Sequence, residues 1–213
     1  MFEFVKAGGW IMLPIIICSI VSTGIVVERF WSLQRNKILP KHLTASVWQW
    51  LKEGSLDNTK LQTLGKGSAL GRILAAGLVN RHMDRARMKE SVEEVGRQVV
   101  HEMERFLNTL GTIAAISPLL GLLGTVVGMI KVFTAITVVG VGNPGELAGG
   151  ISQALITTAA GLSVAIISLI FYRYFRGKVD ELVVEMEQEA IRLVDVLHAN
   201  REKSAGGNGG KTA

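Results

Sequence analysis

Apolar residues are gathered into three long blocks, and none of the blocks contains a charged residue. They cover residues 7–27, 106–130 and 147–172, which are 21, 25 and 26 residues long. A helix needs about 20 apolar residues to cross a hydrocarbon core of about 30 Å, so each block is long enough to span a bilayer. The pattern therefore predicts an all-α integral membrane protein with three transmembrane helices.

The polar stretches between the blocks predict how the rest of the chain is divided. Stripes of apolar residues at spacings of three and four indicate helices, while runs of small and polar residues indicate loops or a tail. The predicted segments are an N-terminal extracytoplasmic segment (1–8), transmembrane helix 1 (9–30), a cytoplasmic helical domain (31–105), transmembrane helix 2 (106–138), a short extracytoplasmic loop (139–146), transmembrane helix 3 (147–172), a cytoplasmic helix (173–202) and a disordered tail (203–213).

The distribution of Lys and Arg predicts the orientation. Residues 28–105 carry 14 of the 23 basic residues, the stretch from Arg173 onward carries 7, and residues 138–146 carry none. Because basic loops stay on the cytoplasmic side, the N-terminus is expected outside and the C-terminus inside. The net charge of +5 has the same origin. No basic patch with interleaved aromatic residues indicates a nucleic-acid partner.

Two apolar stripes continue beyond the blocks, and they predict that helices two and three extend far into the cytoplasm. The first stripe runs without a break into the second block, and the second follows the third block. Helices of this length need partners for their apolar stripes, and neighbouring subunits are the natural ones. The stripes consist of Met88, Val92, Val95, Val99, Met103, Phe106 and Leu110, and of Val179, Leu182, Met186, Ala190, Leu193 and Leu197.

Local capping signals predict where the third long helix begins. Asn143 is a good N-cap, Pro144 suits the first helical position, and Glu146 complements the positive end of the helix dipole. One helix is therefore expected from Pro144 to about residue 200. Short helices are expected between residues 38 and 83, where four glycines favour breaks: Gly54, Gly65, Gly67 and Gly71.

The residues do not favour an enzyme, a metal site or a cofactor site. Cys18 is the single cysteine, the four histidines lie outside the blocks, and no Asp or Glu occurs inside any block. A membrane enzyme would need a nucleophile and base, or a metal, at membrane depth. The glycine patterns at 140–145 and 205–212 lack the strand and helix of a nucleotide site, and they indicate a turn and a tail. A proton path through this chain therefore needs a titrating acid from another polypeptide.

Small residues recur on one face of helix two and of helix three, a pattern typical of membrane helices that approach closely. Gly121, Gly124, Gly128 and Gly161 are the residues that we expect to pack the helices. Thr125 and Thr158 leave two alternatives open. Each hydroxyl could bond back to its own helix, or it could face a shared cavity and meet a partner's carboxylate.

Two segments resemble the signature helices of the MotA/TolQ/ExbB proton-channel family. They are PLLGLLGTVVGMIKVF (118–133) and GGISQALITTAAGLSVAI (149–166), and the opening GGWIMLPIIICSIVSTGIVVERFW (8–31) resembles the first helix of ExbB-like members. The likeness extends to about residue 200, including helix order and loop sizes. Three helices rather than four indicate the ExbB and TolQ branch.

The resemblance implies a function and its partners. ExbB-like proteins are inner-membrane subunits of Gram-negative bacteria, with the outer loop in the periplasm. They form a pore-lining homo-oligomer, a pentamer, around the single transmembrane helices of an ExbD dimer, whose membrane aspartates titrate. Protonmotive force is passed on to TonB, which drives import through outer-membrane receptors.

Matching by motif places this chain's site residues. Thr125 and Thr158 fall on the two pore threonines of the family, and Thr157 and Gln153 are expected on the same proton pathway. The family position of Gln153 holds a glutamate in well-known ExbB proteins. Glutamine cannot titrate, so a relay through a carboxylate is not expected here. The departure leaves a TolQ-like subunit of the envelope-maintenance motor as the alternative, and a passive scaffold as a further rival.

Overall fold

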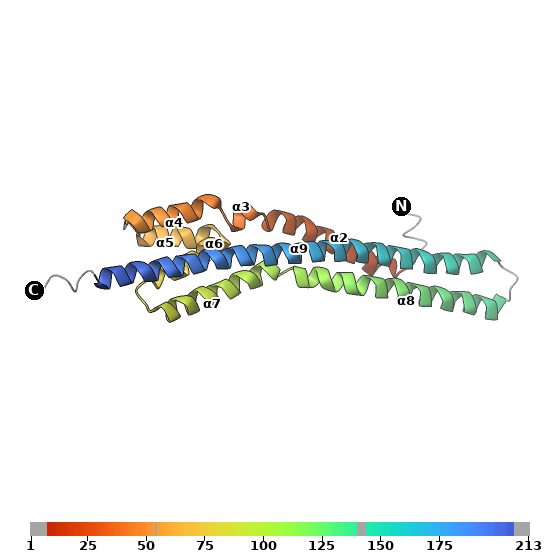
Figure 1. Ribbon diagram of the computed structural model, residues 1–213. Coiled ribbons are helices and arrows are strands. Elements are labelled where there is room, and N and C mark those ends of the chain that lie inside the picture. The colour runs from red at the N-terminus through yellow and green to blue at the C-terminus, as the bar shows by residue number, and fades with distance from the viewer. Residues whose placement is uncertain (1–7, 54, 140–143, 207–213) are drawn as a thin grey trace, which may run out of the picture. The chain divides into compact units, whose positions relative to one another are not determined.

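A computed structural model of the chain describes residues 8–53, 55–139 and 144–206. These ranges contain helices joined by turns and no strand (Figure 1), so the predicted all-α fold is confirmed. The Asn143 cap falls outside them, as do residues 1–7 of the predicted N-terminal segment, 140–143 of the loop and 207–213 of the tail. The helices are α2 (Met12–Ser32), α3 (Arg35–Ile38), α4 (Lys41–Glu53), α5 (Asn58–Gly67), α6 (Ala69–Val79), α7 (Arg85–Glu104), α8 (Leu107–Val139) and α9 (Pro144–Gly206).

Three helical stretches are long and apolar enough to cross a membrane. They are Met12–Ser32, Arg85–Thr137 and Leu147–Ala199, and their most apolar windows have mean hydropathies of 1.8, 2.1 and 2.2. Only 22%, 33% and 28% of the residues in these windows are buried within the chain. A soluble protein rarely leaves so much contiguous apolar surface uncovered. The prediction of a multi-pass membrane protein with three spans is confirmed.

The described helices form two compact units. Of the described residues, those within 1–30 and 105–176 form the membrane unit, and those within 31–104 and 177–213 form the polar unit. The membrane unit therefore holds α2, α8 and the first part of α9, while the polar unit holds α3 to α7 and the last part of α9. Helix α9 begins at Pro144, as the sequence predicts, and it contributes to both units.

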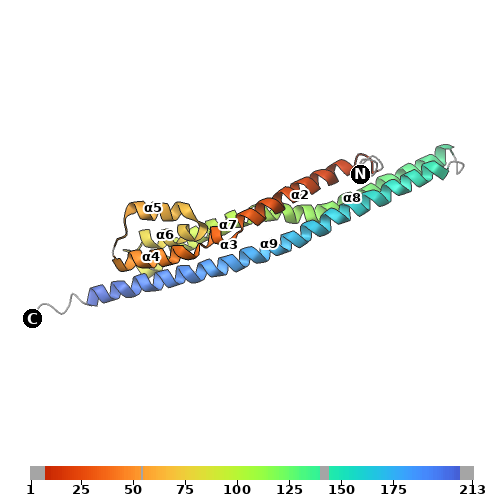
Figure 2. The ribbon, with the colours of Figure 1, turned by 90° about the horizontal axis from the view of Figure 1, so that it is seen from above.

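In the membrane unit, α8 lies beside the first part of α9 in both ribbon views (Figures 1 and 2). Helix α2 packs against α9 through a polar pair and an aromatic cluster. The Ser22 and Ser168 hydroxyl oxygens lie 2.7 Å apart in a buried hydrogen bond. The ring of Phe30 meets those of Phe171 and Phe175 edge to face, with centroids 5.7 and 5.0 Å away. Such aromatic pairs add about 0.5–1.5 kcal/mol each beyond the area that they bury.

Helices α7 and α8 are separated by a turn at Arg105 and Phe106, whereas the unbroken apolar stripe predicted a continuous helix. Neither residue is a helix breaker, so backbone propensity does not impose the turn. The Phe106 ring instead lies against two cations, with the Arg29 guanidinium 4.9 Å and that of Arg105 5.1 Å from its centroid. These cation–π contacts are the favourable interactions that the structure shows at the break.

The polar unit is built around α6, which buries seven of its eleven residues. Ser68 caps this helix, since its hydroxyl accepts a hydrogen bond of 3.0 Å from the Gly71 amide. Gly65 and Gly71 lie inside helices, so they are not the breakers that the sequence suggested. A Cβ atom at Gly71 would meet the Leu64 carbonyl, and one at Gly77 would lie 3.2 Å from the Leu193 side chain. At these two positions the glycines permit close packing of α6.

The two apolar stripes are covered within the chain, which corrects the expectation that neighbouring subunits cover them. Leu182, Met186 and Leu193 of α9 are no more than 1% exposed, and so are Met88 and Val99 of α7. Since α6 packs against α7 and approaches Leu193 through Gly77, helices of the same chain supply the contacts. A groove of about 810 Å³ remains beside α7 and α9, and its lining includes Val100, Val183 and Ile191.

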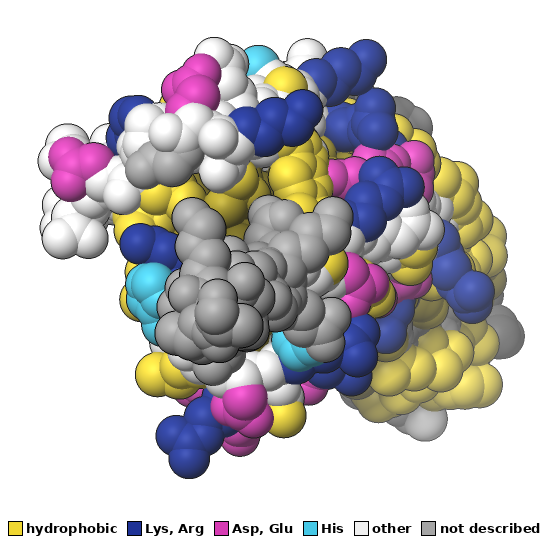
Figure 3. Space-filling model, turned by 60° about the vertical axis from the view of Figure 1, so that its left-hand side comes forward, with side chains coloured by type: hydrophobic (Ala, Val, Ile, Leu, Met, Phe, Trp, Pro, Cys, Tyr) yellow, Lys and Arg dark blue, Asp and Glu magenta, His cyan; other side chains and the backbone are white. Residues whose placement is uncertain are grey.

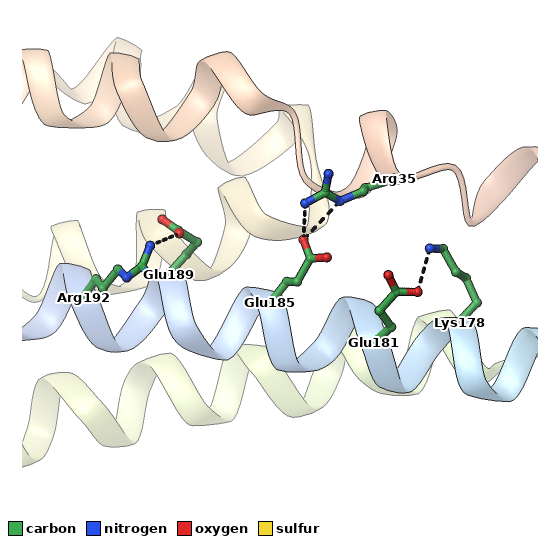
Figure 4. Close-up of polar contacts among 6 residues, drawn as sticks. All are labelled: Arg35, Lys178, Glu181, Glu185, Glu189 and Arg192. Atoms are coloured by element: carbon green, nitrogen blue, oxygen red, sulfur yellow. Dashed lines mark hydrogen bonds and ion pairs between the residues drawn. The ribbon is translucent and has the colours of Figure 1, made fainter.

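Ion pairs line the surface of α9 in the polar unit (Figure 4). The Arg35 guanidinium of α3 donates to the Glu185 carboxylate at 2.7 Å, and this bond raises the pKa of Arg35. Within α9, the Lys178 ammonium donates to Glu181 at 2.8 Å and lowers the pKa of that carboxyl. A lowered carboxyl pKa stabilises the fold above its unfolded pKa, and the contribution is lost as the pH falls. Exposed pairs of this kind contribute little to stability, because water and salt screen them.

Figure 3 shows a face of the polar unit with its side chains coloured by type. Lys and Arg side chains are interspersed there with Asp and Glu side chains, and apolar side chains are visible between them. This mixed surface is typical of a protein face in water. It contrasts in composition with α8, where Leu119, Leu122 and Phe133 are each more than half exposed.

Candidate functional site

The small residues of α8 and α9 face one another in the membrane unit. A Cβ atom at Gly121 would lie 3.1 Å from the Thr157 carbonyl oxygen and from the Thr158 Cα. One at Gly161 would lie 2.5 Å from the Ser117 carbonyl oxygen and 3.0 Å from the Gly121 Cα. Backbone therefore meets backbone at both glycines, which is the closest approach that two membrane helices make.

The same contact continues along both helices toward the end of α8. A Cβ atom at Gly124 would meet the Thr157 side chain, and one at Gly128 would lie 2.8 Å from the Ala154 Cβ and from the Gly150 carbonyl oxygen. The glycines that the sequence singles out therefore all lie where α8 and α9 of one chain touch. The pattern is satisfied within the chain, without a neighbouring subunit.

The three threonines of the predicted pathway differ in their hydrogen bonds. The Thr158 hydroxyl donates across the interface to the Gly121 carbonyl at 3.0 Å, and its side chain is half-buried. The half-buried Thr125 donates to the Leu122 carbonyl of its own helix at 2.6 Å. Thr157 is fully buried and donates to carbonyls of α9. A hydroxyl that donates keeps its oxygen lone pairs, so Thr125 and Thr158 can still accept a hydrogen bond from a protonated acid, and a hydroxyl can rotate to donate to an ionised one.

The backbone carbonyl of Gln153 accepts from the Thr157 hydroxyl at 3.0 Å, but the Gln153 side chain bonds to other groups. It is 7% exposed, and its side-chain oxygen accepts a 2.9 Å hydrogen bond from the Lys131 ammonium. Its side-chain nitrogen donates to the Gly8 carbonyl at 3.2 Å. Sequence reasoning missed both bonds. Gly8 and Gln153 are 145 positions apart, and no local pattern signals such a pair.

Ser117 is a second residue that the sequence did not single out. It is 0% exposed, and its hydroxyl has no hydrogen-bond partner among the described residues. The next residue, Pro118, has no amide hydrogen, so the helix loses one backbone hydrogen bond at the same place. At this point of the α8–α9 contact, a buried hydroxyl therefore lacks a partner and α8 has one backbone hydrogen bond fewer.

Ser117→Ala is expected to stabilise the protein by about 1 kcal/mol, because it removes a buried polar atom that gains nothing in the fold. Thermal unfolding in detergent micelles measures the change. Ser163→Ala is the matched control, since the exposed Ser163 hydroxyl bonds to the Ala159 carbonyl and its loss should be near neutral. A less stable Ser117→Ala variant would contradict the assignment of Ser117 as unpaired.

The described residues contain no group of three or more His, Cys, Asp or Glu side chains that could hold a metal ion. The site is instead a close helix contact that carries hydroxyl groups in an apolar segment. Such an arrangement can pass protons only in company with a group that titrates.

The model of the MotA/TolQ/ExbB proton channel family matches residues 66–188. This stretch is more than half of the chain, and it includes all of α8 and the part of α9 that contacts it. The chain belongs to this family. It is therefore a component of the proton-channel class, in agreement with the resemblance of its two signature helices.

Relatives in the family cover most of the chain. A protein named ExbB-like 1, a biopolymer transport protein of Synechocystis sp., is 36% identical over 174 residues, which are 80% of this chain and 68% of the relative. An ExbB biopolymer transport protein of Vibrio cholerae serotype O1 is 31% identical over 72% of this chain and 69% of its own length. The biopolymer transport protein ExbB of Pseudomonas putida is 24% identical over 92% of this chain and 63% of its own length. The chain thus spans about two thirds of the length of these relatives.

Proposed function

We propose that the chain is a subunit of an inner-membrane proton channel that couples protonmotive force to TonB-dependent transport across the outer membrane. Family membership supports the channel, and the names of the relatives support the ExbB type. The observation that carries the proposal is a hydroxyl-bearing α8–α9 contact in segments that contain no acid. A partner must therefore supply the titrating group, and an ExbD-like single-span dimer with a membrane aspartate has the required chemistry.

Thr125 and Thr158 are the residues that we propose to face this aspartate. Both are half-buried, and both keep acceptor capacity on their hydroxyl oxygens. Thr157 is fully enclosed, so in this proposal it supports the helix contact beside the pathway. Gln153 cannot titrate, and its bonds to Lys131 and Gly8 occupy both ends of its amide.

The apolar surface that one chain leaves uncovered supports a homo-oligomer, and the family resemblance supports a pentamer. On α8 and α9, Leu122, Ile130, Leu155 and Ile170 are each more than 55% exposed. Copies of the chain, lipid and the partner helices are the surfaces that can cover them. The basic stretches at residues 28–105 and from Arg173 onward support an N-terminus in the periplasm and a C-terminus in the cytoplasm.

Proton flux into vesicles tests the proposal. The purified chain alone should conduct no more than protein-free vesicles, because its membrane segments hold no titrating acid. Co-purification with an aspartate-bearing single-span partner should produce flux under an imposed potential, and an Asp→Asn change in that partner should abolish it. Flux from the chain alone would overturn the proposal. The genes beside this one would separate a TonB output from the TolQ-like alternative that Gln153 leaves open.

A further inference from the structure

The carboxamide of Gln153 joins three elements of the membrane unit. It belongs to α9, it accepts from Lys131 of α8 at 2.9 Å, and it donates to the Gly8 carbonyl at 3.2 Å. Met12, the first residue of α2, lies four residues after Gly8. The bond to Gly8 therefore fixes the backbone immediately before α2 begins.

The orientation of this amide is set by its partners. An ammonium group can only donate, and a backbone carbonyl can only accept. The side-chain oxygen of Gln153 must therefore face Lys131, and the nitrogen must face Gly8. With the amide turned over, both contacts would become repulsive, so the observed arrangement is the one that satisfies all three groups.

Gly9 shows how closely the chain approaches the amide. Its φ is +68°, a left-handed backbone conformation that residues other than glycine rarely adopt. A Cβ atom at this position would also meet the Gln153 side-chain nitrogen. The Gly9 carbonyl then accepts the first bond of the turn into α2, from the Met12 amide at 3.1 Å. Two features of the backbone, a conformation and a contact, are thus fitted to the side chain of Gln153.

We propose that Gln153 is a positioning residue that fastens the start of α2 to the α8–α9 pair by hydrogen-bonding Lys131 and Gly8 together. This role is independent of proton conduction. An amide suits the position at any pH, because it accepts from a cation and donates to a carbonyl at the same time. A buried side chain that meets only one of these needs leaves the other partner unsatisfied.

Glutamate at position 153 would make both hydrogen bonds in only one of its two protonation states. An ionised carboxylate would accept from Lys131 but has no hydrogen to offer to the Gly8 carbonyl, and two oxygens would then face each other. A protonated carboxyl would reproduce both bonds, because it has one donor and one acceptor. Among the described residues, the charged group that these bonds bring against position 153 is Lys131. Gln153→Glu should therefore hold the start of α2 only while its carboxyl is protonated.

The distance between spin labels at positions 10 and 129 tests the proposal in the full chain with Cys18→Ser. Trp10 and Met129 are 64% and 39% exposed, so Trp10→Cys and Met129→Cys are accessible to label. In the labelled protein that retains Gln153, pulsed electron paramagnetic resonance spectroscopy should give a narrow distance distribution that does not change between low and high pH. Gln153→Leu, which fills the site without hydrogen bonds, should broaden it at every pH. Gln153→Glu should be narrow at low pH and broad at high pH.

Ser152→Ala is the matched control, because Ser152 is the exposed neighbour of Gln153 on α9, and it should keep the narrow distribution. A narrow distribution in Gln153→Leu would overturn the proposal, and so would a Gln153→Glu distribution that does not change with pH. If Gln153→Leu fails to fold, the two pH values of the single Gln153→Glu protein still decide. No proton flux is read, so failure here is distinct from failure of the proposed channel.

Discussion

Gly161→Ala should lower the stability of the protein by about 2–4 kcal/mol. Its Cβ atom would lie 2.5 Å from the Ser117 carbonyl oxygen and 3.0 Å from the Gly121 Cα and amide nitrogen. These are backbone atoms, which cannot rotate aside, so α8 and α9 must separate. Overpacking costs about 1–3 kcal/mol, and the loss of the Thr158 bond to the Gly121 carbonyl adds about 1 kcal/mol. Unfolding by denaturant in detergent micelles measures the sum.

Gly149→Ala is the matched control for this substitution. Gly149 also lies in α9, but a Cβ atom there would have no neighbour within 4 Å. Alanine is favoured over glycine in a helix by up to about 1 kcal/mol, so this variant should be as stable as the parent or slightly more stable. Equal stability of Gly161→Ala and Gly149→Ala would contradict the close α8–α9 contact at Gly161.

Thr125→Val and Thr158→Val should each reduce proton flux about 10- to 100-fold in vesicles that also hold the aspartate-bearing partner. Valine keeps the shape of threonine and removes the hydroxyl. A hydrogen bond to a group that becomes charged is worth about 1.5–3 kcal/mol, which corresponds to this change in rate. The prediction rests on the proposed function, and the flux is followed by quenching of a pH-sensitive dye.

Comparison of the two threonine variants separates an effect on proton conduction from an effect on helix packing. The Thr158 hydroxyl bonds across to α8, so its loss weakens the helix contact as well as the proposed pathway. The Thr125 hydroxyl bonds within its own helix, so Thr125→Val should lower flux with little change in unfolding. Thr134→Val is the control, because the exposed Thr134 hydroxyl also bonds within α8, and flux should stay at the parent level. Parent-level flux in both Thr125→Val and Thr158→Val would refute the pathway.

Much of the architecture could be predicted from short stretches of sequence. The three spans follow from runs of uncharged apolar residues, and the start of α9 at Pro144 follows from local capping rules. The stripe on α9 identified residues that prove to be buried, among them Leu182 and Leu193. Periodicity names the apolar face of a helix, but it carries no information on which surface covers that face. The covering by helices of the same chain could therefore not be predicted.

The polar contacts between helices were the least predictable part of the site. Ser22 and Ser168 are 146 positions apart, and Gly8 and Gln153 are 145 apart. Such pairs depend on the rotation of each helix about its axis, which apolar packing against lipid does not fix. For Thr125 and Thr158 the sequence left a local and a shared arrangement open. The structure shows a local bond for Thr125 and an interhelical bond for Thr158.

Helix α9 completes both units, and it follows the other described helices along the chain. Residues 31–104 must wait for the chain beyond Gly177 before their core closes. The 73 residues from 105 to 177 take about 4–15 seconds at a translation rate of about 5–20 residues per second. During that time the face of α6 that packs around Gly77 has no α9 to cover it. We therefore expect chaperones and membrane proteases to recognise nascent chains until α9 has emerged, and stop codons within α9 to lead to rapid degradation.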